Sequence, residues 1–122
     1  NWTGLTDVLF KYKREWNTIP LYRSIINATN SDFRILFFTG DLDLACPALM
    51  VDRATSIIAK ENEFEEIENA PKIWRYLDDF GGAQTSYRKR DNNVTMDVLT
   101  VRGSGHFVSI NHPSRFFQII NN

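Results

Sequence analysis

The sequence predicts an α/β fold in which a mixed, mostly parallel sheet is flanked by helices. A continuous apolar run from Ile35 to Phe38 is typical of a strand buried on both faces, as in parallel sheets covered by helices. Amphipathic segments before and after this run indicate a helix–strand–helix order. Later, residues 84–90 and 94–101 are predicted to form two strands, and Asp91-Asn92-Asn93 between them tolerates the backbone geometry of a hairpin turn.

Composition limits the classes of protein that the chain can belong to. With 122 residues, 43% hydrophobic and 24% charged, it belongs with folded globular domains. No internal repeat, linker or low-complexity segment divides it, so residues 1–122 are expected to form a single unit. Fourteen Lys and Arg against fifteen Asp and Glu argue against a nucleic acid or an anionic membrane as partner. No apolar run approaches the ~20 residues that span a bilayer.

The first half of the chain predicts three helices around the central strand. Residues 6–16 form a helical pattern that Thr6 can cap, and a second short helix follows with Pro20 near its start. The strand stops at Gly40, and Pro47 begins the next helix.

The second half is punctuated by loops. The acidic segment 61–68 predicts a solvated helix end or loop, and residues 71–80 lead into Gly81-Gly82. The tight loop 103–105 follows the last strand, and Pro113 opens a final helix.

Two strand ends present residues that could perform acid–base chemistry. Asp41 and Asp43 lie just past the end of the first strand, and His106 follows the loop after the last. Open α/β sheets place ligands and catalytic groups at this edge. A carboxylate bonded to one ring nitrogen fixes the histidine tautomer and leaves the other nitrogen as a base. Acid before histidine is the order of the α/β-hydrolase Ser…Asp…His triad, and spacing leaves open which aspartate takes part.

Other candidate sites are weaker. His112 precedes Pro113 and is expected to border the last helix. Neither histidine has a Cys or carboxylate cluster nearby at ligand spacing, so we expect no metal site and no cofactor. No serine stands in a Gly-x-Ser-x-Gly motif, so a nucleophile would have to come from residues outside this chain.

Three sequons favour the secretory pathway. They begin at Asn1, Asn27 and Asn93, and each is a candidate glycosylation site. Cys46 is the single cysteine, which excludes an internal disulfide. The chain begins without a Met, and we expect it to be an excised or processed segment.

Two motifs resemble the serine carboxypeptidases, the lysosomal and vacuolar α/β-hydrolase exopeptidases. Residues 35–46 (ILFFTGDLDLAC) are similar to the family's apolar strand followed by Gly-Asp-x-Asp-x-x-Cys, and residues 100–108 (TVRGSGHFV) contain a counterpart of its Gly-Ala-Gly-His-Met-Val. The resemblance covers the whole chain and implies the C-terminal part of an α/β-hydrolase fold. It also implies that Asp43 and His106 are catalytic, that Asp41 is a turn residue, and that Cys46, a free buried thiol, and Phe107 border the substrate pocket.

The sequence departs from the family pattern after both motifs. Pro47 and Met50 replace the family's Asn and Gly, and Ser109 and Asn111 replace its Pro and Asp. The implied function is that of a secreted, lysosomal or vacuolar serine-type carboxypeptidase acting on peptides, with this segment inactive alone. The alternatives are a catalytically inactive, carboxypeptidase-like binding or protective partner, and a glycosylated interaction module with coincidental motifs. We expect the free edge of the 35–38 strand to be covered by the missing half, by another chain or by a second copy.

Overall fold

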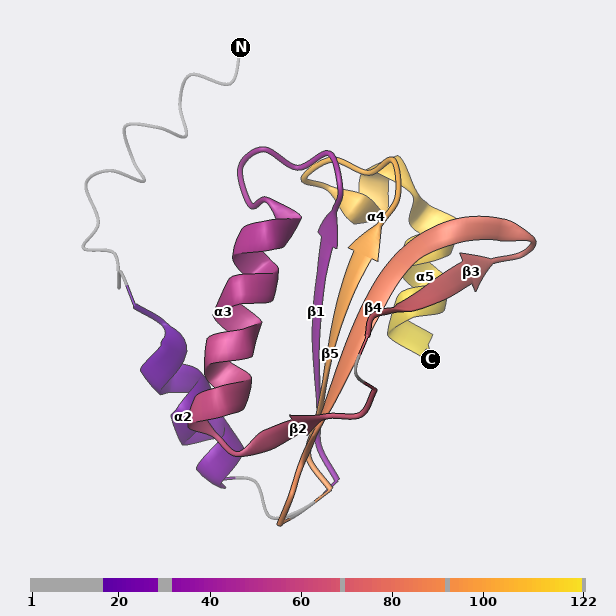
Figure 1. The fold of residues 1–122 in the computed structure, drawn as a ribbon. Coiled ribbons are helices and arrows are strands. Elements are labelled where there is room, and N and C mark those ends of the chain that lie inside the picture. The colour runs from indigo at the N-terminus through magenta and orange to yellow at the C-terminus, as the bar shows by residue number, and fades with distance from the viewer. Residues whose placement is uncertain (1–16, 29–31, 69, 92, 122) are drawn as a thin grey trace, which may run out of the picture.

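The computed structural model describes residues 17–28, 32–68, 70–91 and 93–121, which form three layers with helices on both faces of one sheet (Figure 1). The expected helix over residues 6–16 lies outside the described residues. The elements in chain order are α2 (Ile19–Ala28), β1 (Arg34–Gly40), α3 (Ala48–Glu61), β2 (Phe64–Glu66), β3 (Lys72–Tyr76), β4 (Asp79–Lys89), β5 (Thr95–Val101), α4 (Val108–Asn111) and α5 (Pro113–Asn121).

The sheet is mixed, which corrects the expectation of a mostly parallel one. Its order is β1-β5-β4-β2, with β3 also paired to β4. Only the β1–β5 pair is parallel among the described strands, running in register from Arg34 with Thr95 to Gly40 with Val101. The other pairs are antiparallel because hairpins and short connections join their strands.

Strand β5 supplies the core on both faces of the sheet. Its alternate residues Met96 and Val98 pack into one cluster with Ile58 of α3, and Leu99 and Val101 pack into a second cluster. The second cluster includes Ile119 of α5. Helices α2 and α3 therefore cover one face of the sheet and α5 covers the other (Figure 1).

Strand β1 is less buried than its apolar run predicted. Ile35, Leu36 and Phe37 are partly buried, and Phe38 remains 39% exposed. Among the described strands, β1 pairs only with β5 and forms the edge of the sheet. A strand with an unpaired edge lacks the second neighbour that would complete its burial.

Two further segments differ from the prediction. Helix α3 ends within the acidic segment, but Phe64–Glu66 then forms β2 instead of a loop, because Phe64 buries its ring while Glu65 and Glu66 stay exposed. The second is the short helix α4 between His106 and Pro113, which the sequence did not predict.

The predicted hairpin of β4 and β5 is confirmed, with Gln84 opposite Leu99.

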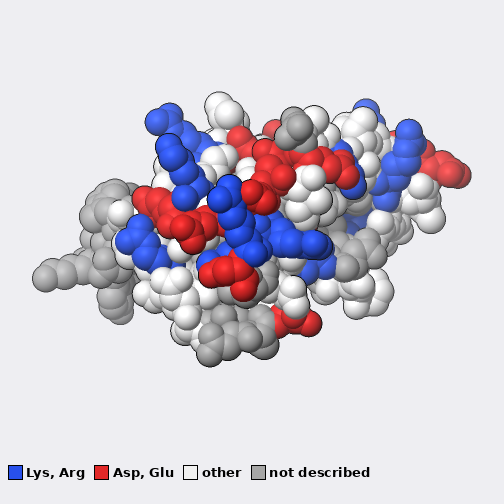
Figure 2. Space-filling model, turned by 60° about the horizontal axis from the view of Figure 1, so that its bottom comes forward, with Lys and Arg blue, Asp and Glu red and all other residues white. Residues whose placement is uncertain are grey.

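Charges at the lower end of the molecule are intermixed. Figure 2 shows acidic and basic side chains interspersed on this face. Ion pairs of the described residues include Arg23 with Glu61 and Arg34 with Asp97. The face shown thus carries no broad surface of one sign.

No helix among the described residues has the length and apolar character needed to cross a membrane.

Candidate active site

The Asp43 carboxylate and the His106 ring meet at the ends of the two parallel strands. Oδ2 of Asp43 lies 2.8 Å from Nδ1 of His106, a hydrogen-bond distance. The Asp43 side chain is buried, whereas the His106 side chain is 51% exposed. The separation that coincidental motifs would predict is not observed.

The geometry distinguishes Asp43 from Asp41. Asp43 faces the histidine, and Oδ1 of Asp41 instead accepts a hydrogen bond of 2.7 Å from the backbone N–H of Gly103. Asp41 therefore does more than shape its own turn, since it links the loop after β1 to the loop after β5. The sequence could not reveal this contact because 62 residues separate the two groups.

Backbone hydrogen bonds also join the two loops. The N–H of Asp41 donates to the carbonyl of Val101, and that of Leu42 donates to the carbonyl of Ser104. Gly40 permits this approach, because a Cβ at that position would lie 2.1 Å from the Ser104 carbonyl oxygen.

Backbone amides hold the Asp43 carboxylate in place. Its Oδ1 accepts hydrogen bonds from the N–H groups of Ala45, at 2.8 Å, and Cys46, at 3.1 Å. The hydrogen bond from the Cys46 amide, followed by the one from His106, lowers the pKa of Asp43 below its ordinary value of 3.8, and burial opposes them. The carboxylate is thus ionised and oriented toward the ring at neutral pH.

This arrangement defines what His106 can do. A hydrogen on Nδ1 satisfies the aspartate, so Nε2 carries the free electron pair of the neutral ring. The ionised carboxylate stabilises the ring when Nε2 gains a proton. An exposed imidazole in this setting can serve as a general base and then as a general acid.

The histidine loop is anchored from α4 and the residue that follows it. Oδ1 of Asn111 accepts a hydrogen bond of 3.0 Å from the N–H of Gly105, and the ring of His112 lies 3.1 Å from the carbonyl of Gly103. Sequence reasoning placed His112 at the border of the last helix but missed its contact with the loop and that of Asn111. Their closeness to His106 along the chain was the available signal.

Cys46 and Phe107 flank the pair. Cys46 is an exposed free cysteine, which corrects the expectation of a buried thiol, because no described residue covers it. Phe107 is 50% exposed, and its ring meets the His106 ring edge-on with centroids 5.0 Å apart. Both side chains border the space in front of His106.

Three potential metal ligands meet at His106, although no such cluster is visible at ligand spacing in the sequence. Ligand atoms of Asp43, Cys46 and His106 lie within 4.8 Å of one another. The sequence conceals this cluster because 60 residues of chain separate Cys46 from the histidine, and only the parallel pairing of β1 with β5 closes that gap.

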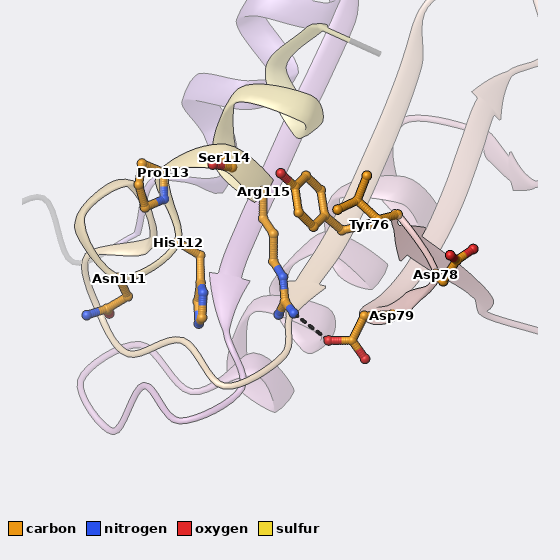
Figure 3. A pocket seen from close by; sticks show the side chains of 9 residues that line it. Tyr76, Asp78, Asp79, Asn111, His112, Pro113, Ser114 and Arg115 are labelled. Carbon is orange, nitrogen blue, oxygen red and sulfur yellow. Dashed lines mark hydrogen bonds and ion pairs between the residues drawn. The ribbon is translucent and has the colours of Figure 1, made fainter.

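A separate cavity lies between the β3–β4 turn and the start of α5. It encloses about 720 Å³ and is lined by Tyr76–Asp79 and Asn111–Arg115. Arg115 reaches across it to Asp79, with 2.9 Å between the guanidinium nitrogen and the carboxylate oxygen (Figure 3). Neither Asp43 nor His106 lines this cavity, so it is distinct from the pair.

Comparison with known proteins identifies the family to which the chain belongs. The sequence model described as "Serine carboxypeptidase" matches residues 1–122, the whole chain. The chain belongs to the serine carboxypeptidase family. Members of this family have the α/β-hydrolase fold, which agrees with the mixed sheet and its flanking helices.

Curated relatives of this chain come from Caenorhabditis elegans. Serine carboxypeptidase ctsa-3.1 is 32% identical over 117 residues, covering 91% of this chain and 20% of the relative. Serine carboxypeptidase ctsa-4.1 is 36% identical over 108 residues, covering 88% of this chain and 22% of the relative. The chain therefore spans about a fifth of the length of these relatives.

Two of the three expected glycosylation sites lie within the described residues. Asn1 lies outside the described residues. Asn27, in the last turn of α2, and Asn93, before β5, are both exposed.

Proposed function

We propose that this chain is the C-terminal segment of a serine-type carboxypeptidase and contributes the aspartate and histidine of its catalytic triad. The hydrogen bond between Asp43 and His106 is the observation that carries the proposal. Family membership supplies the reaction class, which is hydrolysis of the last peptide bond of a peptide.

In this mechanism a serine outside the 122 residues attacks the scissile carbonyl. Nε2 of His106 takes the serine proton and then delivers it to the leaving amine. Asp43 keeps the ring in the tautomer with hydrogen on Nδ1 and stabilises the imidazolium that forms. Cys46 and Phe107 border the substrate beside the histidine. The segment alone is inactive because it lacks the nucleophile.

The remainder of the protein is proposed to pair with the free edge of β1. The unpaired edge and the exposed Phe38 support this contact. A second copy of the chain on the same edge is the other arrangement that would cover it. The three sequons support a secretory, lysosomal or vacuolar, or extracellular location.

Asn111 stands where the family usually has an Asp, and this replacement is weaker support for a catalytically inactive binding partner than the sequence alone indicated. An amide oxygen there accepts the Gly105 hydrogen bond, a role that a carboxylate oxygen could also fill. Activity is therefore the better-supported interpretation.

The experiment uses the full-length protein and peptides with a free C-terminus. The wild type should release the terminal residue, and His106→Ala should lose about 10³–10⁶-fold in kcat. His112→Ala is the matched control, because it removes the other histidine without touching Asp43. It deletes one contact with the Gly103 carbonyl and should lower kcat by no more than about tenfold. An inactive wild type with an intact upstream serine would favour the binding-partner alternative.

A further inference from the structure

The thiol of Cys46 joins the hydrogen-bonded side chains of Asp43 and His106 to form a group of three different potential metal ligands. Asp43, Cys46 and His106 offer a carboxylate oxygen, a thiol sulfur and an imidazole nitrogen within 4.8 Å of one another. We propose that these three residues form a binding site for a zinc ion, and that the ion inhibits the enzyme. The binding stands on the geometry alone, whereas the inhibition rests on the proposed peptidase function.

The ligand set fits zinc better than the common hard cations. Zinc takes Cys sulfur at about 2.3 Å, His nitrogen at about 2.0–2.1 Å and carboxylate oxygen at about 2.0–2.2 Å. In a tetrahedral site these lengths put the ligand atoms about 3.3–3.6 Å apart. The observed limit of 4.8 Å therefore requires a closure of roughly 1 Å, which rotation of the exposed Cys46 side chain can supply. The 2.8 Å between Asp43 Oδ2 and His106 Nδ1 must in turn widen by about 0.5 Å, which rotation of the half-exposed His106 ring can supply. A thiolate disfavours Mg²⁺ and Ca²⁺, which prefer oxygen ligands.

The first two ligands are already positioned by other groups. Two backbone amides hold Oδ1 of Asp43, which leaves Oδ2 directed toward the site. The hydroxyl of Thr39 donates a hydrogen bond of 3.0 Å to the Cys46 carbonyl and fixes the backbone that carries the thiol. Such outer hydrogen bonds orient ligands and reduce the entropy lost when a metal binds.

Binding of the ion to His106, the third ligand, is incompatible with catalysis. Binding through Nδ1 keeps Asp43 within reach of the ion, because Nδ1 is the ring nitrogen that faces its carboxylate. The proton that Nδ1 shared with Asp43 then moves to Nε2, and the neutral ring has no free electron pair left there. The Cys46 thiol loses its proton to solvent. His106 therefore cannot accept the serine proton while the ion is bound.

The site is also open. His106 and Cys46 are both exposed, so three protein ligands leave a fourth position for water. An open three-ligand site exchanges its metal more easily than a closed four-cysteine site. We therefore expect reversible inhibition rather than a structural ion.

Cobalt titration of the full-length protein tests the site without turnover. Co²⁺ should produce a near-ultraviolet thiolate-to-cobalt charge-transfer band, and one equivalent of Zn²⁺ should remove it. Cys46→Ser should lose this band and bind Zn²⁺ at least about 100-fold more weakly, since even outer-shell changes cost about 10–100-fold. His112→Ala, the matched control, should retain the band. A spectrum unchanged in Cys46→Ser, or no saturable binding in the wild type, would overturn the proposed site.

An activity measurement tests inhibition separately. Zinc at the concentration that saturates the cobalt displacement should abolish peptide hydrolysis, and a chelator should restore it. The ratio of activity with and without zinc, taken within each protein, should rise toward one in Cys46→Ser. Full activity at saturating zinc would overturn the inhibitory role. If the wild type is inactive without metal, the proposed peptidase function fails, and the cobalt spectrum still decides whether the metal site exists.

Discussion

Gly40 allows the loops that carry Asp43 and His106 to meet, and its replacement by alanine provides a quantitative test of the site. The new Cβ would lie 2.1 Å from the Ser104 carbonyl oxygen and 2.4 Å from that of Gly105. Real Cβ atoms do not approach heavy atoms closer than 3.0 Å, so the two loops must separate by about 0.9 Å, the difference between 3.0 and 2.1 Å. Both obstacles are backbone atoms, which cannot rotate away as a side chain would.

A separation of this size should affect both catalysis and folding, by amounts that can be measured separately. Misplacing reacting groups by about 1 Å can cost about 100-fold in rate, so kcat/KM of full-length Gly40→Ala should fall by about that factor. Overpacking of this kind costs about 1–3 kcal/mol of stability, which a chemical denaturation curve would register. Circular dichroism should show that the protein is still folded when the rate is measured.

Gly105→Ala is the matched control in the same pair of loops. Its Cβ would meet Oδ1 of Asn111 at 3.4 Å, an ordinary contact, so kcat/KM should stay close to that of the wild type. Wild-type kcat/KM in Gly40→Ala, or an equal loss in both variants, would refute the reasoning that the close approach at Gly40 positions the pair.

Three further predictions concern side chains. The difference in stability between wild type and Asp43→Asn should persist from neutral pH down to about pH 4 and shrink below it. A carboxyl whose pKa is lowered in the folded state stabilises the fold above its unfolded pKa and loses this effect as the pH falls through the folded pKa. A difference that closes near pH 6 would contradict this prediction. Asn111→Asp should retain activity. Asn111→Ala removes the hydrogen bond that anchors Gly105 and should lower kcat by up to about tenfold, the equivalent of one hydrogen bond. Equal activities of the two variants would rule out this anchoring role. Asp97→Ala should lower the free energy of unfolding, measured by urea denaturation, by about 1–3 kcal/mol, because the buried carboxylate accepts hydrogen bonds from Arg34, Ser86 and Gln84. A loss below about 0.5 kcal/mol would show that water replaces these bonds.

The elements that sequence reasoning predicted best are those with strong local signals. The hairpin of β4 and β5 has a polar turn between two β-prone segments, and α3 begins directly after Pro47. Strand β2 was missed because three acidic residues surround Phe64, and the pairing of that strand with β4 is a tertiary contact that overrides the local charge pattern. The parallel share of the sheet was overestimated because a continuous apolar run reports burial and not strand direction.

The site shows the same division. The resemblance of two motifs to a known family pointed to Asp43 and His106, while spacing alone left Asp41 as an equal candidate. The contacts of Asp41 with Gly103 and of Asn111 with Gly105 had no sequence signal beyond closeness to the motifs. The exposure of Cys46 also differs from what the resemblance implied.

The sequence by itself determined the α/β class, most of the helices and strands, and the family, since these depend on local periodicity and on short motifs. Only the tertiary structure decided which carboxylate faces the histidine and that Cys46 joins them as a third potential ligand. The physical reason is that parallel pairing of β1 with β5 brings two loops some 60 residues apart to the same edge of the sheet. Distances between such loops are set by strand register and by the missing side chain of Gly40, neither of which a local pattern of residues contains.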